Sequence, residues 1–298
     1  MANRMNTLNE RLQRVDARAQ AIVQAAARHE QLPQQQEEWW PSLIQFFDGE
    51  DVMFDTLRIN RDCFEDALVL VNNVALNTRG RKGAIRTHRE KLFFLMVFMS
   101  KGVEVLEVLV TRFMRTREHI VETAKSIAYL FRDALVGISV CFLNERVNEA
   151  PGAALVVDCT VCKIRRPKTP FQDAKVFFSG KHFICALKKE VCVNVRSGTA
   201  ALVSKAYPGS VHDIKILKEH AAEVNDVLGT RSLLADLGYR GAQRDVPTIV
   251  VCDQESRELR SKRVIVECFF GRLKMLWSVF STAWRLGEDC FDLFFNLA

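Results

Sequence analysis

The hydrophobic pattern changes at residues 151 and 152, a Pro-Gly pair, and this change most constrains the fold. After it, short β-branched and apolar runs predict five strands, over 153–164, 183–196, 199–206, 233–235 and 248–251. Helical spacing predicts helices over 210–220 and 257–280. Three leading strands, followed by alternating helices and strands, predict a mixed α/β layer structure for residues 151–298.

The segment before this change is helical in pattern, because residues 64–142 carry apolar side chains mostly at helical spacing. We expect helices over 88–100 and 103–113, and a third from a Thr116 cap to about residue 131, a helix-turn-helix outline. Basic residues around this outline are candidates for binding DNA phosphates: Arg79, Arg81, Lys82, Arg86, Arg89, Arg112, Arg115 and Arg117. The same pattern also suits an ordinary helical bundle with a solvated basic loop.

The first 38 residues are predicted to form an extension. Apolar residues from Met5 to Ala26 repeat at spacings of three and four, which makes a seam of about three heptads. This seam suits either a dimerisation helix or an amphipathic helix that covers its own domain. Residues 31–38 are polar and typical of a linker. The predicted domains are a helical and polar extension (1–38), a helix-turn-helix-like DNA-binding region (39–150) and an α/β domain (151–298).

Charge and composition restrict the partners. Residues 1–78 carry a net charge of −5, whereas residues 79–150 and 151–298 carry +5 and +6. Such a basic surface permits a polyanionic partner such as DNA. Nine cysteines scattered through apolar stretches favour a reducing, intracellular compartment over a disulfide framework. The longest apolar run, residues 92–99, is too short to span a membrane, so we expect no membrane partner.

Three carboxylates occupy positions where an uncompensated charge is costly. Asp158 lies inside an apolar strand, and Asp236 directly follows another. Glu267 lies in the long predicted helix, on one stripe with Arg263 and Lys274. Carboxylates from two strands and a helix suit a pair of Mg²⁺ ions that activate water or a 3′ hydroxyl for attack on a phosphodiester. Each carboxylate alone also suits a hydrogen-bonded or capping role.

The segment 208–213 holds further candidates. Ser210 suits an N-cap with Asp213 three residues later, as in a capping box, and Asp213 equally suits metal support or substrate contact. His212 is a candidate DNA contact. The sequence has no Gly-rich phosphate loop, G-x-S-x-G or H-E-x-x-H, so P-loop, serine-hydrolase and zinc-protease chemistry have no support.

Several blocks in this order resemble the DDE transposase superfamily, in particular the Harbinger-type transposases and the nucleases derived from them. Residues 157–160 look like the first catalytic block, 234–239 like the second, and the Arg-x3-Glu-x6-Lys pattern of 263–274 like the third. Residues 178–182 and 207–213 resemble two further family stretches. The chain departs from the pattern at three positions: Cys159 and Ala235, where the family usually has Gly, and Arg260, where related bacterial elements carry Tyr.

The resemblance implies a ribonuclease-H-like domain in which Asp158, Asp236 and Glu267 hold two Mg²⁺ or Mn²⁺ ions, with Asp213 as the alternative second ligand. Residues that would orient the glutamate or contact phosphate are Arg263, Lys274 and His212. The implied activity is metal-dependent cleavage of DNA, with strand transfer at element ends if the protein still transposes.

The expected location is the nucleus, and the expected partners are DNA, a second copy of the chain or a separate DNA-binding protein. One alternative is a domesticated transposase that binds DNA without catalysis. An RNA-directed nuclease on the same fold is another.

Overall fold

The structure is a computed structural model that describes residues 57, 59–75, 85, 87–102, 106, 109, 115–147, 153–168, 170–251 and 257–298, with side chains except those of 136–147, 153–154 and 257–260. The chain divides into two compact units, residues 1–100 with 104–137 and residues 101–103 with 138–298. The seam from Met5 to Ala26 and the linker at 31–38 lie outside the described residues, and the predicted domain boundaries stay a prediction.

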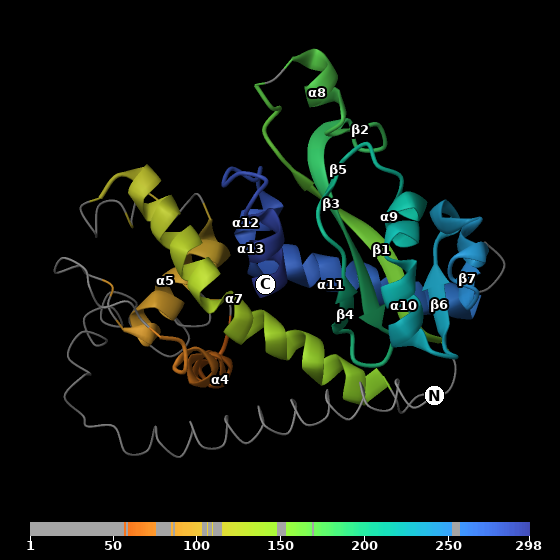
Figure 1. The fold of residues 1–298 in the computed structure, drawn as a ribbon, viewed down its shortest axis with the longest axis horizontal. Helices are drawn as coiled ribbons and strands as arrows, with labels where there is room; N and C mark the ends of the chain where they lie inside the picture. The colour runs from red at the N-terminus through yellow and green to blue at the C-terminus, as the bar shows by residue number, and fades with distance from the viewer. Residues whose placement is uncertain are drawn as a thin grey trace. The chain divides into compact units, whose positions relative to one another are not determined.

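The helices described before residue 148 are α4 (Arg61–Val71), α5 (His88–Lys101) and α7 (Arg117–Val147) (Figure 1). The Thr116 hydroxyl accepts the backbone N–H of His119 at 3.3 Å, which confirms the predicted cap. Helix α7 continues past the predicted end near residue 131, because the apolar spacing persists and one interior glycine costs only about 1 kcal/mol. Of the predicted helix 103–113, the structure describes only Leu106 and Leu109.

A mixed sheet forms the centre of the second unit, with strand order β2-β3-β1-β6-β7 and with β4 and β5 also paired to β3. Strand β1 (Ala153–Lys163) is antiparallel to β3 (Ile184–Asn194) and parallel to β6 (Ser232–Ala235), which is parallel to β7 (Ile249–Val251). The other strands are antiparallel to β3: β2 (Phe178–Ser179), β4 (Ala200–Val203) and β5 (Tyr207–Pro208). The predicted mixed α/β architecture is confirmed. The two strands that the sequence did not predict have two residues each, too few to show an alternating pattern.

Helices cover both faces of this sheet (Figure 1). On one face lie α9 (Asp213–Glu219) and α10 (Ala221–Leu228), and on the other lies α11 (Arg257–Leu276). Shorter helices complete the unit: α8 (Phe171–Lys175), η2 (Leu237–Tyr239), η3 (Ala242–Arg244), α12 (Ser278–Ser281) and α13 (Phe291–Leu297). None of the helices in the described part of the chain is both long and apolar enough to cross a membrane.

Two predicted helix ends are wrong. Helix α9 begins at Asp213, and its N-cap residue is His212, whose side chain makes no capping bond. Ser210 lies in a turn instead, because its backbone N–H bonds to the carbonyl of Val176 and the next N–H bonds to Pro208. Helix α11 ends at Leu276 rather than at residue 280, because the backbone of the following Trp277 leaves the helical region (φ −117°, ψ 89°).

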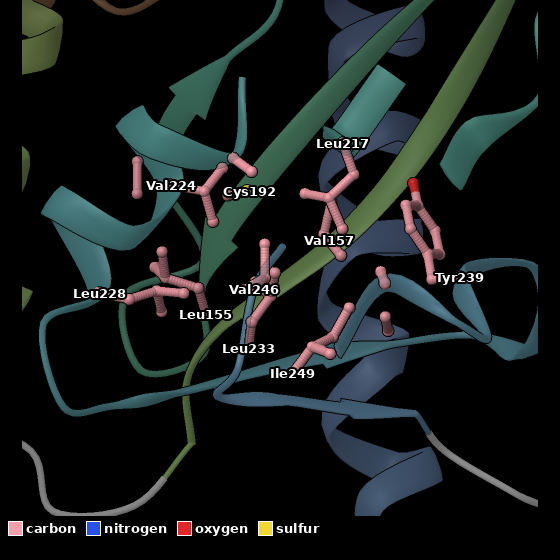
Figure 2. Packing of buried hydrophobic residues seen from close by; sticks show 14 residues of the cluster. Leu155, Val157, Cys192, Leu217, Val224, Leu228, Leu233, Tyr239, Val246 and Ile249 are labelled. Atoms are coloured by element: carbon pink, nitrogen blue, oxygen red, sulfur yellow. The ribbon is translucent and has the colours of Figure 1, made fainter. Parts of the chain in front are cut away.

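The core under α9 and α10 fixes the position of two neighbouring strands. Leu155 and Val157 of β1 pack there with Leu233 of β6, against Leu217 of α9 and Val224 of α10 (Figure 2). All five are fully buried. Burying such side chains contributes about 1.5 to 3 kcal/mol each, so β1 and β6 are held firmly side by side. The residues within β1 and those that directly follow β6 are therefore well positioned.

Candidate active site

The register of β1 and β6 places two of the predicted carboxylates next to each other. Val156 of β1 pairs with Leu234 of β6 in parallel register. Two residues further along are Asp158 in β1 and Asp236, which directly follows β6 and keeps extended backbone. Side chains two residues apart on an extended chain project from the same face of a sheet. The structure therefore brings Asp158 and Asp236 together, as the sequence predicts.

Asp158 carries a negative charge that the protein compensates only in part. Burial raises the pKa of its carboxyl group to about 6, and the carboxylates of Asp236 and Asp213 push the pKa in the same direction. The backbone N–H of Cys159, 2.8 Å from Oδ1, and the guanidinium of Arg263 act in the opposite direction. The net result is surplus negative charge at this point of the sheet, which a cation would stabilise.

Asp236 is held in place by its own turn. It is the N-cap of η2, and its Oδ1 accepts the backbone N–H of Gly238 at 2.8 Å. A Cβ atom on residue 238 would lie 3.0 Å from that same oxygen, tighter than an ordinary contact. Glycine at 238 therefore allows the turn to close around the carboxylate.

Asp213 is close enough to affect Asp158, but it already has a partner in the protein. Its Oδ1 accepts a hydrogen bond from the Lys188 ammonium group at 2.8 Å, and this ammonium also donates to the Val211 carbonyl at 2.8 Å. His212, next in the chain, is exposed at the start of α9. The pairing with Lys188 makes Asp213 a poorer donor for a cation than Asp236.

Helix α11 carries the third block, and its three predicted residues have different surroundings. Arg263 is half-buried near Asp158, and its Nε has no hydrogen-bond partner among the described residues. Lys274 donates to the Val161 carbonyl of β1 at 2.9 Å. Glu267 lies between them along the helix and is exposed. The described part of the chain contains no group of three His, Cys, Asp or Glu side chains placed to hold a metal ion, so Glu267 does not join the two aspartates in this structure.

The match with known proteins falls on this part of the chain. Residues 157–292 match the family model of the DDE superfamily endonucleases. The match begins at the residue before Asp158 and includes Asp236 and Glu267. No match was found among curated proteins or among solved structures. The match supports the resemblance at superfamily level, and the Harbinger subtype stays a prediction.

Endonucleases of this family typically use divalent metal ions, and the residues present can be tested for fit. Asp158 and Asp236 supply oxygen donors alone, the donor type that Mg²⁺ and Mn²⁺ prefer. The two carboxylates repel each other enough to affect the pKa of Asp158, and a divalent cation would relieve this repulsion. This pair, in the region that matches the DDE family model, therefore fits the cation.

The predicted DNA-binding arginines and lysine lie upstream of the region that matches the DDE family model. Five of them are outside the described residues: Arg79, Arg81, Lys82, Arg86 and Arg112. Arg89 makes two hydrogen bonds of 2.7 Å to the Glu65 carboxylate, and its guanidinium lies 5.9 Å from the centre of the Phe64 ring. Arg115 and Arg117 are exposed at the start of α7. Their role in DNA binding stays a prediction.

The sequence did not predict a buried polar cluster that Cys159 of β1 forms with Glu190, His220 and Tyr239. Glu190 of β3 is fully buried, and burial raises its pKa. The Nε2 atom of His220 lies 2.8 Å from Glu190 Oε1, although the two groups are not aligned for a hydrogen bond. The Cys159 thiol lies 4.0 Å from Glu190 Oε2 and 3.5 Å from the Tyr239 hydroxyl. Three consecutive charged residues in the middle of a strand, 188–190, were the sequence signal for this cluster.

Proposed function

We propose that residues 151–298 form a ribonuclease-H-like, divalent-metal-dependent DNA endonuclease of the Harbinger type. The observation that carries the proposal is the parallel register that sets Asp158 beside Asp236 with surplus negative charge. The order of the strands is consistent with this fold. Strands β4, β3 and β1 are successively antiparallel neighbours, and β6 and β7 then add in parallel on the other side of β1.

Asp158 and Asp236 would hold the cation, and Glu267 would supply the third carboxylate. When bound, a pair of Mg²⁺ or Mn²⁺ ions supplies an activated water or 3′ hydroxyl and stabilises the leaving oxygen of the phosphodiester. Arg263 contributes a positive charge beside Asp158. Lys274 has three N–H donors, of which one is used at the Val161 carbonyl, so it can also donate to a phosphate oxygen.

The proposed partner is DNA, which such an enzyme would meet in the nucleus. A second copy of the chain or a separate DNA-binding protein would supply target choice. The basic charge of residues 79–298 supports a polyanionic partner, because it persists when the acidic amino-terminal segment is set aside.

The test is cleavage of supercoiled plasmid by the full chain with Mg²⁺ or Mn²⁺. We expect Asp158→Asn, Asp236→Asn and Glu267→Gln each to lose more than about 100-fold in rate, because even outer-shell partners of metal ligands cost about 10- to 100-fold. The matched control is Glu223→Gln, which removes an exposed carboxylate from α10. Equal cleavage by the wild type and all three site variants would sink the proposal. DNA binding that chelator does not affect, without cleavage under any metal, would favour the non-enzymatic alternative.

The choice between Asp236 and Asp213 has its own test in the same assay. Because Asp213 is already paired with Lys188, we expect Asp213→Asn to retain more cleavage than Asp236→Asn. The reverse order would make Asp213 the second ligand.

A further inference from the structure

The segment that connects β1 to β3 exposes aromatic side chains beside basic ones. Phe171, Phe178 and Phe183 are 64%, 42% and 80% exposed, and they are the exposed phenylalanines of the described chain. We call residues 165–168 and 170–183 the aromatic–basic lobe. It contains a single acidic residue, Asp173, and five Lys or Arg residues: Arg165, Arg166, Lys168, Lys175 and Lys181. Exposed apolar side chains in a segment with an excess of basic residues are typical of an interaction surface.

Backbone hydrogen bonds fix this lobe to the sheet. The N–H of Ala186 in β3 donates to the Phe177 carbonyl at 2.8 Å, and the N–H of Ser210 donates to the Val176 carbonyl at 3.1 Å. A Cβ atom on Gly209 would come within 2.5 Å of the Phe177 carbonyl oxygen, so only glycine permits this close approach. In Figure 1 the lobe, with α8 and β2, projects beyond the helices that cover the sheet. The segment that carries the exposed aromatic rings is therefore held to the sheet by backbone hydrogen bonds.

Phe183, the last residue of the lobe before β3, is held in a backbone conformation that residues other than glycine rarely adopt. Its φ is +56°, the one positive φ among the non-glycine residues that the structure describes. The N–H of Phe183 donates to the Ser179 carbonyl at 2.8 Å and closes the turn. The ring is 80% exposed, so packing in the protein does not compensate the strain. Strain of this kind is typical of functional positions.

The last residues of the lobe lead into β3, the strand that carries Lys188 of the candidate active site. Lys188, the partner of Asp213, follows Phe183 by five residues along β3, which corresponds to about 16 Å of strand. Burial lowers the pKa of His182, next to Phe183, and the charges of Lys181, Lys188 and Lys274 lower it further while Asp213 raises it. Three of these groups, Lys188, Lys274 and Asp213, belong to the candidate active site, so charges of the site reach His182.

The chemistry of the lobe identifies its occupant. The excess of basic over acidic side chains fits a chain of phosphates, and exposed flat rings fit the faces of nucleobases. The Arg166 guanidinium lies 5.7 Å from the centre of the Phe171 ring, a cation–π arrangement that offers a second flat, positive group. Bases within an intact duplex are already stacked on one another, so a stacking surface selects unpaired ones.

We propose that the aromatic–basic lobe binds unpaired nucleotides of a DNA strand beside the candidate active site. The inference rests on the proposed function for the choice of DNA as the polyanion. The phenylalanine rings stack on bases, and the basic side chains contact the phosphates between them.

The test measures binding of a short blunt duplex and of the same duplex with a single-stranded tail, in chelator so that no cleavage occurs. The tail carries the fluorescent base 2-aminopurine. We expect Phe183→Gly to weaken binding of the tailed DNA by about 5- to 150-fold, the usual worth of one aromatic stacking partner. Blunt-duplex binding should change by less than about twofold, and 2-aminopurine should be quenched more by the wild type than by Phe183→Gly.

This variant separates binding from folding. Glycine tolerates a φ of +56°, so Phe183→Gly should be at least as resistant to urea as the wild type. Phe183→Tyr keeps the ring and should retain tail binding. Val250→Ala removes exposed apolar atoms from β7, outside the lobe and the predicted DNA-binding region, and should change neither affinity. Replacing Arg165 and Lys168 by Gln should lower the salt dependence of tail binding by about 0.7 in the log–log slope for each lost contact.

Three outcomes would overturn the inference. They are wild-type tail binding by Phe183→Gly, an equal loss on blunt and tailed DNA, or binding of anionic lipid vesicles or protein in place of tailed DNA. The readout does not depend on catalysis. If plasmid cleavage is unchanged in Asp158→Asn but Phe183→Gly loses tail binding, the proposed function fails and the lobe assignment stands.

Discussion

Lys189 and Asp158 are both charged residues within the sheet of the second unit, and the protein surrounds them differently. The ammonium group of Lys189 is fully enclosed and donates to the Ser204 carbonyl at 2.6 Å, to Asp292 at 2.7 Å and to Asn296 at 3.2 Å. Its three N–H groups therefore have three acceptors. Asp158 accepts one backbone N–H and has the Arg263 guanidinium nearby, but it also has two further carboxylates close to it.

The difference distinguishes Lys189, a charge that the fold itself satisfies, from Asp158, a charge that we propose to bind a cation. The chain supplies everything that Lys189 needs, and in doing so it fastens α13 to β3. At Asp158 the chain brings further negative charge instead, which costs stability unless something outside the chain neutralises it. A largely buried carboxylate beside further carboxylates is where a cation is expected.

The largest effect should come from removing the structural charge. Lys189→Met leaves the Ser204 carbonyl and Asp292 without their partner, and we expect a loss of about 2 to 3 kcal/mol in the free energy of unfolding. This lies below the usual range for a broken buried pair because Asp292 is 44% exposed and water can solvate it. Urea unfolding measures the loss.

The matched control for Lys189 is Lys205→Met. Lys205 and Glu219 form a pair of 3.2 Å in which both side chains are more than half exposed, so this change should cost well under about 1 kcal/mol. Similar losses for the two variants would contradict the structural role given to Lys189.

Removing the charge of Asp158 should raise the free energy of unfolding, whereas removing that of Lys189 lowers it. Asp158→Asn deletes a carboxylate whose pKa is raised to about 6, and we expect the free energy of unfolding in chelator to rise by about 2 kcal/mol at about pH 8. A shift of about two pKa units is worth about 3 kcal/mol, and partial solvation recovers some of it. The measurement is urea unfolding of both proteins under identical conditions.

The pH dependence of this gain has a defined direction. Because the folded protein holds the Asp158 proton more tightly than the unfolded chain, stability in chelator should fall as the pH rises from about 4 through about 6. Above about pH 7 the full cost is present, and below about pH 4 it is absent. The free energy of unfolding of the wild type minus that of Asp158→Asn, measured at each pH, isolates this contribution. A difference that does not vary with pH would show that Asp158 is not the group responsible.

A divalent cation should offset the loss of stability that the charge of Asp158 causes. At ten times its dissociation constant, Mg²⁺ should raise the stability of the wild type by about 1.4 kcal/mol. Asp158→Asn and Asp236→Asn should gain little, whereas Glu223→Gln, on α10, should gain as much as the wild type. An equal gain in all four proteins would place the cation elsewhere.

Sequence patterns predicted the strands that hold Asp158 and Asp236, because buried parallel strands are short apolar runs with clear boundaries. They also located both carboxylates, since each interrupts or ends such a run. The register that sets the two side by side depends on tertiary pairing between strands 78 positions apart, counting from Asp158 to Asp236, and local periodicity carries no information about it.

Other features depended on contacts that no local pattern reveals. The pairing of Asp213 with Lys188 joins a helix to a strand, and the exposed position of Glu267 depends on how α11 is rotated against β1. The start of α9 was misplaced because Ser210 has a strong capping preference, while its backbone N–H is taken by the Val176 carbonyl. The positive φ of Phe183 follows from closure of the turn by Ser179, against the preference of the residue itself.

The smallest predicted effect concerns how precisely Asp236 is held. Gly238→Ala places a methyl group 3.0 Å from Asp236 Oδ1, and because this oxygen ends a rotatable side chain, we expect a loss of less than about 1 kcal/mol in stability. The same displacement should weaken Mg²⁺ binding several-fold, measured by the cation-dependent rise in unfolding midpoint. Gly271→Ala is the control, because nothing lies within 4 Å of its added methyl and alanine favours the helix. If both variants keep full Mg²⁺ stabilisation, the turn at Gly238 does not position Asp236, and the surplus charge at Asp158 would have to attract the cation without a precisely placed second carboxylate.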